Sequence, residues 1–110
     1  LSLRDSRQSA DFMTYARFIN AHPDWPQING AIRVNAETAL LRDGADDGTL
    51  IDWFARHPPA TDEGRVRLVQ ALSHTGDRLR ARQRAVEDWH AGAFDGPRQA
   101  RVIALVGPFS

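Results

Sequence analysis

The chain has 110 residues, of which 42% are hydrophobic, and its 14 basic residues balance its 14 acidic ones. This length is typical of one domain that buries its own core. The balanced charge leaves no surplus of cations for nucleic acid, and no apolar run approaches the roughly 20 residues of a membrane-spanning helix. The absence of cysteine excludes disulfides, thiolate catalysis and cysteine zinc sites. We therefore expect a single globular domain that neither binds nucleic acid nor crosses a membrane.

Apolar residues recur with helical spacing along the chain, and no segment shows the alternation of a strand. The first half predicts three helices, at about residues 9–21, 26–42 and 49–56. The first and third are expected to end at His22 and His57, because each of these histidines precedes a proline, which disfavours helical geometry in the residue before it.

The second half predicts three more helices, each opened by a capping residue. Thr61 and Asp77 are suited to cap the fourth and fifth, because a side-chain oxygen there accepts a free amide of the first turn. Residues 95–97, Asp-Gly-Pro, open the sixth. The predicted fold class is therefore all-α, with six helices. The apolar residues expected to face inward in the last two are Leu79, Val86 and Trp89 in the fifth and Ala100, Ile103 and Ala104 in the sixth.

Two patterns recur with a period in the low thirties. Residues 18–23 (FINAHP) match residues 53–58 (WFARHP) 35 positions later, and Ala39, Ala71 and Ala104 stand 32 and 33 positions apart. Such a period is typical of helix–turn–helix repeats. The sequence therefore predicts an αα-superhelix, a solenoid of about three helical hairpins. The alternative is a six-helix bundle in which these matches have no meaning.

The histidines and glutamates are the first candidates for chemistry. His22 and His57 are expected to bond the last free carbonyls of the helices that they end. The spacing of the four histidines, which include His74 and His90, matches no metal-binding motif, so we predict no metal site.

The chain has three glutamates, each on a predicted helix and none beside a second carboxylate suited to acid–base chemistry. Glu63 is explained by the positive end of a helix dipole, and Glu87 by a pair with Arg84 three residues before it. Glu37 lies mid-helix among apolar neighbours and has no such explanation. We predict no catalytic residue.

Four arginines alternate along the fifth predicted helix. Helical geometry places Arg78 and Arg82 on one face and Arg80 and Arg84 on another. These arginines either line a groove for an anionic polymer or form a solvated surface that nearby acidic residues neutralise, namely Asp77, Glu87 and Asp88.

The three tryptophans divide by position. Trp53 and Trp89 have the helical spacing of core or inter-repeat residues, which favours packing over stacking on sugar rings. Trp25 lies in a predicted turn between two prolines and is expected to be partly exposed.

Three stretches are similar to those of a known family: residues 18–26 (FINAHPDWP), residues 50–59 (LIDWFARHPP) with the hairpin of residues 71–77, and Trp89 with Gly92, Phe94 and Asp95. Together they span about residues 11–107. In these stretches the chain resembles the soluble lytic murein transglycosylases.

The resemblance implies a U-shaped superhelical array that precedes a lysozyme-like catalytic domain. Those enzymes cleave the glycan strands of peptidoglycan in the periplasm and leave 1,6-anhydromuramoyl ends. The catalytic acid of the family is a glutamate followed by serine, whereas here the glutamates precede Thr38, Gly64 and Asp88. No catalytic residue is therefore transferred to this chain.

We expect residues 1–110 to be one αα-superhelical segment of a larger periplasmic protein, without its catalytic domain. Its expected role is that of a non-catalytic scaffold that holds peptidoglycan and needs no cofactor or metal. Its expected partners are glycan strands or the catalytic domain of the same protein. The alternatives are a freestanding helical-repeat module that binds a protein or peptide and, third, a small helical enzyme.

Overall fold

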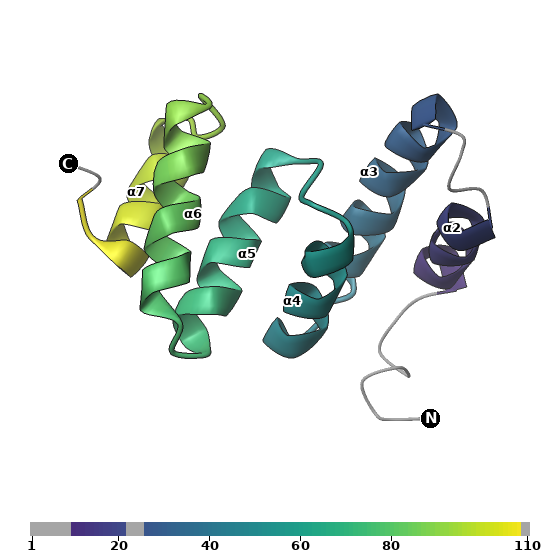
Figure 1. The fold of residues 1–110 in the computed structure, drawn as a ribbon, viewed down its shortest axis with the longest axis horizontal. Helices are drawn as coiled ribbons and strands as arrows, with labels where there is room; N and C mark the ends of the chain where they lie inside the picture. Colours follow the sequence, from purple (N-terminus) through teal and green to yellow (C-terminus); the bar gives the residue numbers. More distant parts are fainter. Residues whose placement is uncertain (1–9, 22–25, 109–110) are drawn as a thin grey trace.

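In a computed structural model, which describes residues 10–21 and 26–108, the described part of the chain is all-helical. It contains six helices and no strand (Figure 1): α2 (Ala10–Ala21), α3 (Pro26–Arg42), α4 (Asp47–Arg56), α5 (Asp62–His74), α6 (Arg78–His90) and α7 (Gly96–Val106). The all-α prediction is confirmed, and the bounds predicted for the first three helices agree to within two residues. None of the described helices is both long and apolar enough to span a bilayer. The predictions for His22 and Trp25 fall outside the described residues.

The bounds of the last four helices follow from side-chain caps. In each, a side-chain oxygen accepts an amide N–H three residues further on, which satisfies one of the free donors of the first turn. The caps are Asp46 for α4, Thr61 for α5, Asp77 for α6 and Asp95 for α7. The predicted caps of α5 and α6 are confirmed. Helix α4 begins two residues earlier than predicted because Asp46 caps it.

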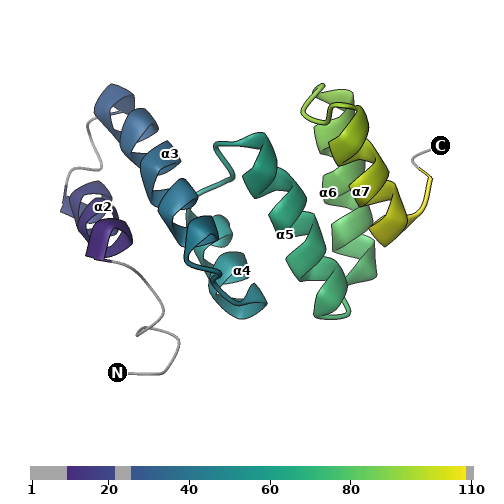
Figure 2. The same ribbon diagram turned by 180° about the vertical axis from the view of Figure 1, so that it is seen from behind.

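The helices pack largely as consecutive pairs, with α5 at the centre. Helix α2 lies against α3, α4 against α5, and α6 against α7, while α5 also contacts α3, α6 and α7. Figures 1 and 2 show the pairs side by side, from α2 and α3 at one end of the molecule to α6 and α7 at the other. The molecule measures 42 × 33 × 21 Å along its principal axes.

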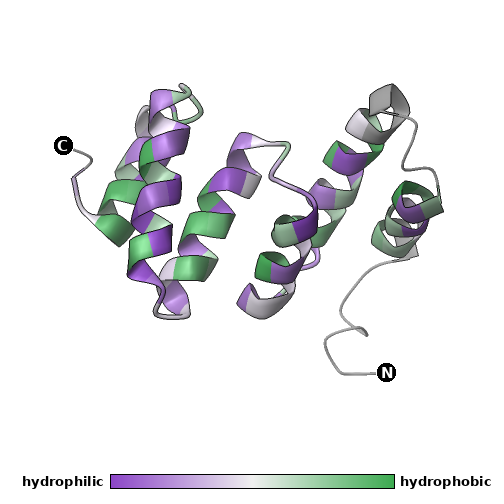
Figure 3. Ribbon diagram, in the orientation of Figure 1, coloured by the Kyte–Doolittle hydropathy of each residue, from purple (hydrophilic) through white to green (hydrophobic). Residues whose placement is uncertain are grey.

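Small residues form the buried face of α6. Ala81, Ala85 and Asp88 are buried there, whereas Leu79 is 71% exposed. The prediction that Leu79 faces inward is therefore wrong. Alanines at this spacing let α6 pack closely on its neighbours, and most of α6 is hydrophilic in Figure 3.

Helix α7 also turns a different face inward than predicted. Val102 is fully buried, Ile103 is half-buried, and Ala100 and Ala104 are exposed. The prediction for the two alanines is wrong, because Val102 defines the side of α7 that faces the core.

Trp53 anchors the N-terminal end of the molecule. Its side chain is buried, and its ring meets the edge of the Phe12 ring with centroids 5.1 Å apart. Phe12 lies on α2 and Trp53 on α4, so this contact joins two helices that are not neighbours in sequence. The prediction that Trp53 is a packing residue is confirmed.

Candidate functional site

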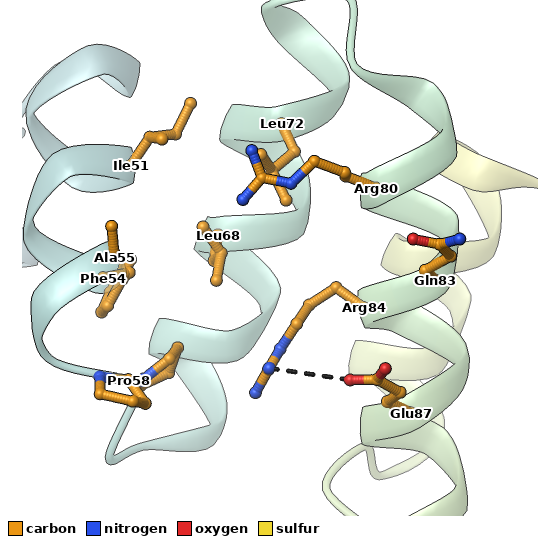
Figure 4. A pocket seen from close by; sticks show the side chains of 11 residues that line it. Ile51, Phe54, Ala55, Pro58, Leu68, Leu72, Arg80, Gln83, Arg84 and Glu87 are labelled. Carbon is orange, nitrogen blue, oxygen red and sulfur yellow. Dashed lines mark ion pairs between the residues drawn. The ribbon is translucent and has the colours of Figure 1, made fainter.

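The candidate site is a groove between α4, α5 and α6, with a volume of about 240 Å³. Figure 4 shows α4 and α5 on one side of it and α6 on the other. Its floor is apolar and comes from α4, α5 and the connection between them: Ile51, Phe54, Ala55, Pro58, Pro59, Leu68 and Leu72. We call this feature the α4–α6 groove.

One face of α6 forms a polar wall of the α4–α6 groove. Arg80, Gln83, Arg84 and Glu87 line it, and the side chains of Arg80 and Arg84 extend toward α5 (Figure 4). These residues are three or four positions apart, so they share one side of the helix. The wall thus carries two cations and one anion above an apolar floor.

The four arginines of α6 do not act together. Arg80 and Arg84, which were predicted to share one face of the helix, both line the groove. Arg82 donates a hydrogen bond from Nη1 to the carbonyl oxygen of Val106, 3.0 Å away, and so ties α6 to the end of α7. Arg78 is exposed. Each of the two predicted alternatives, groove and solvated surface, therefore describes only some of these residues.

The ion pairs of the wall differ in strength. Arg80 Nη1 lies 3.6 Å from Asp77 Oδ2, and both side chains are exposed. Arg84 Nη2 lies 3.2 Å from Asp88 Oδ1, and its Nη1 lies 3.8 Å from Glu87 Oε2, which confirms the predicted pair with Glu87. Exposed ion pairs contribute little because water screens them. Arg80 is therefore the more weakly held cation of the two.

Asp88 is a buried carboxylate behind the wall. The residue is 4% exposed, and its Oδ2 has no hydrogen-bond partner among the described residues. Burial raises the pKa of Asp88, while the nearby guanidinium groups of Arg84 and Arg65 oppose that rise. Arg84 is thus paired, behind the wall, with a carboxylate whose charged form is made less favourable by burial.

Glu37, the glutamate that sequence patterns left unexplained, seals the joint between α3 and α5. Its side chain is 1% exposed. One carboxylate oxygen accepts the amide N–H of Ala60 at 2.8 Å, and the other accepts the amide N–H of Thr61 at 2.9 Å and the Thr61 hydroxyl. Thr61 Oγ1 in turn accepts the amide of Gly64. Glu37 therefore holds the cap of α5 in place.

The other two glutamates, unlike Glu37, have arginine partners. Glu63 Oε1 accepts hydrogen bonds from Arg98 Nε at 3.2 Å and Arg101 Nη1 at 3.0 Å, which joins α5 to α7. The helix dipole predicted at Glu63 accounts for only part of its setting, because two guanidinium groups of α7 also bind it.

The described histidines occupy three separate settings. The ring of His57 packs on Trp53 with centroids 4.1 Å apart, and its Nδ1 has no hydrogen-bond partner in the described part of the chain. Its predicted bond to a helix-end carbonyl is therefore wrong, although its backbone amide donates to the Trp53 carbonyl. Burial, followed by Arg33 and Arg56, lowers the pKa of His57.

His74 Nδ1 lies 3.3 Å from Asp47 Oδ2, and the ring of His90 lies against Trp89 with centroids 4.9 Å apart. Residues 10–21 and 26–108 contain no group of three or more histidine, aspartate or glutamate side chains that is arranged to hold a metal ion. Trp89 is half-buried against the core, as predicted.

Sequence patterns did not reveal the floor of the groove. The paired spacing of Arg80 and Arg84 on one face of α6 was the signal for the wall. Ile51, Ala55 and Leu68 gave no comparable signal, because their alignment depends on how α4 lies beside α5.

No protein family model, curated protein sequence or solved structure matches this chain.

Proposed function

We propose that this chain is a non-catalytic helical scaffold, and that the α4–α6 groove is its ligand-binding site. The resemblance in residues 18–26 and 50–59 favours a lytic transglycosylase as the parent protein and peptidoglycan as the ligand. Under this proposal the chain acts in the periplasm beside the catalytic domain of the same protein.

The placement of the three glutamates carries the proposal. A general acid must present a carboxyl group to a substrate in a cleft. Here Glu37 is enclosed by donors of the α4–α5 connection, Glu63 is bound by two arginines of α7, and Glu87 pairs with Arg84. Glu37 and Glu63 thus link separate elements of the fold, which is the work of a scaffold, while Glu87 pairs within α6.

The packing of the helices supports the superhelical form of this scaffold. The helices follow one another in chain order, α3 contacts α5 and α5 contacts α7, while α6 packs on both α5 and α7. In helical-repeat proteins such neighbour-to-neighbour packing generates extended binding surfaces. The proposed αα-superhelix extends this pattern beyond the three pairs.

Incubation with purified peptidoglycan sacculi tests the proposal. We expect the chain to sediment with the sacculi and to release no soluble 1,6-anhydro-muropeptides, with heat-denatured chain as the binding control and lysozyme as the control for release. Release of such products above a buffer control would contradict the scaffold role. A chain that stays in the supernatant would contradict the peptidoglycan ligand.

The α4–α6 groove itself favours a second candidate, a freestanding module that binds a protein or peptide. Apolar floors edged by a few polar groups are typical of binding sites for small ligands and side chains. A protein captured by the groove in the absence of any binding to sacculi would favour this candidate over the first.

A further inference from the structure

We propose that the α4–α6 groove binds a short peptide that ends in a free carboxylate beside small aliphatic side chains, with this carboxylate at Arg80. The peptide branches of peptidoglycan have this chemistry. The inference rests on the proposed scaffold role, and it assigns the contact to the peptide part of the polymer instead of its sugars.

The floor of the groove is suited to aliphatic groups. Ile51 is half-buried and Ala55 and Pro58 are exposed, so they present methyl and methylene groups to a ligand. Phe54 is the aromatic residue of the lining, and it is only 5% exposed, so its ring face is not open for stacking. Sugar rings commonly stack on exposed aromatic faces, and this floor offers none. The floor therefore favours alanine-like side chains over sugars.

Arg80 is suited to bind a carboxylate. Its side chain is 62% exposed, and its contact with Asp77 is long at 3.6 Å. Its side chain extends toward α5, which contributes Leu72 to the floor (Figure 4). An arginine can bind a carboxylate through two parallel hydrogen bonds, which are shorter and stronger than such an exposed pair. A ligand carboxylate can therefore replace Asp77 at little cost.

Glu87 gives the groove a direction. It lies seven residues after Arg80, which is two helical turns or about 10 Å along α6, roughly the length of three extended residues. Glu87 is exposed and lines the same wall. It repels a second carboxylate, so the charged end of the peptide is held at Arg80 and an uncharged or amino-bearing part is held near Glu87.

The size of the groove limits the ligand. Its volume of about 240 Å³ is below the range of roughly 300–1,000 Å³ that is common for drug-sized ligands. It therefore holds the end of a chain, such as two small residues, while the rest of the peptide lies outside.

Titration of the isotope-labelled chain with short peptides, followed by NMR, tests the inference. The probe is a tripeptide of alanine that ends in two D-alanines, as peptide branches of peptidoglycan do. We expect the amide signals of Ala55 and Arg80 to shift on binding. We expect the C-terminal amide of the same peptide to bind at least about tenfold more weakly, because it lacks the charge-assisted hydrogen bonds.

A pair of matched variants locates the contact on the wall. Arg80→Glu and Arg78→Glu make the same change of charge in the first turn of α6, at exposed positions in both cases. Arg78 is not among the residues that line the groove. We expect Arg80→Glu to weaken binding of the free acid by at least about tenfold and Arg78→Glu to change it by less than about threefold.

A second matched pair tests the floor. Ala55→Glu places a carboxylate in the groove, and Ala100→Glu places one on an exposed position of α7. We expect only Ala55→Glu to abolish the shifts. Circular dichroism of all four variants confirms that they retain the helical fold.

Four results would overturn the inference. They are equal binding of acid and amide, equal losses in Arg80→Glu and Arg78→Glu, no binding at millimolar peptide, and tighter binding of the all-L peptide by tenfold or more. The last result would assign the groove to the C-terminus of a protein. Sedimentation with sacculi separates the two proposals. If wild type and Arg80→Glu sediment equally, the scaffold role remains, but the groove is not the contact with peptidoglycan.

Discussion

The two sides of α5 are built in opposite ways. On the side of α3 and α4, buried side chains interlock: the Trp53 ring meets Phe12, and Glu37 binds the amides that open α5. On the side of α6, Ala81 and Ala85 are buried where the helices pack closely. The α4–α6 groove, lined by long polar side chains of α6, remains open on the same side.

The buried carboxylates of the described residues, Glu37 and Asp88, show the same contrast. Glu37 accepts hydrogen bonds through both of its oxygens, whereas one oxygen of Asp88 lacks a partner among the described residues. A buried polar group that is fully bonded gives rigidity, and one that is not represents a cost to stability. The comparison indicates that polar groups are more completely bonded at the α3–α5 joint than on the side of α5 that faces α6.

The largest expected effect comes from removing the Trp53 anchor on the side of α3 and α4. Trp53→Ala should lower the free energy of unfolding by about 3–5 kcal/mol, the usual cost of deleting a large buried aromatic side chain. Chemical denaturation measures this change. Trp89→Ala, at a half-buried position, should cost less. A loss below 1 kcal/mol in Trp53→Ala would show that Trp53 does not anchor the packing of α2, α3 and α4.

The next effect tests the buried carboxylate of the joint. Glu37→Gln keeps the shape of the side chain but turns one acceptor into an NH₂ donor, which then faces an amide N–H of Ala60 or Thr61. We expect a loss of about 2–3 kcal/mol, since hydrogen bonds to a charged group are lost in a buried site. In Glu63→Gln, at an exposed ion pair, the loss should stay below about 1 kcal/mol. Equal losses in Glu37→Gln and Glu63→Gln would show that the buried hydrogen bonds of Glu37 stabilise the chain no more than the exposed ion pairs of Glu63.

A smaller effect tests how tightly α5 fits against Glu37. A Cβ added at Gly64 would lie 2.1 Å from Glu37 Oε2, so Gly64→Ala should destabilise the chain by about 1–3 kcal/mol. In Gly30→Ala, the added Cβ meets no atom within 4 Å. There the helix propensity of alanine should instead stabilise the chain by up to about 1 kcal/mol. A stabilised Gly64→Ala variant would show that Glu37 moves aside freely.

Much of the fold could be predicted from the sequence, because it depends on local chemistry. Thr61 and Asp77 cap their helices through contacts three residues away, and the prolines after residues 22 and 57 mark helix ends. The period of 3.6 residues gave the number of helices. These signals act within one or two turns of the chain.

The inward faces and the site could not be predicted with the same success. In α6 the hydrophobicity pattern predicts that Leu79 faces the core. The residues that are buried are instead Ala81 and Ala85, because their small side chains allow close packing against the neighbouring helices. Glu37 is explained only by residues more than 20 positions later, at the joint with α5. The α4–α6 groove likewise depends on how three helices lie together. Such long-range placement leaves no periodic trace in the sequence.

The smallest expected effect concerns Asp88, on the side of α5 that faces α6, and it depends on pH. Burial raises the pKa of Asp88 above its ordinary value of 3.8, so the folded chain binds this proton more tightly than the unfolded chain does. The cost of the buried charge is therefore greatest near neutral pH, and it is relieved as the pH falls through the raised pKa toward 3.8. Asp88→Asn has no such proton to bind. We expect the free energy of unfolding of the wild type, relative to Asp88→Asn, to increase from pH 7 to pH 4 in denaturation series at matched salt. A difference that stays constant or decreases over this range would mean that Arg84 and Arg65 hold Asp88 as firmly as the donors of the α3–α5 joint hold Glu37, and the two sides of α5 would no longer differ in this respect.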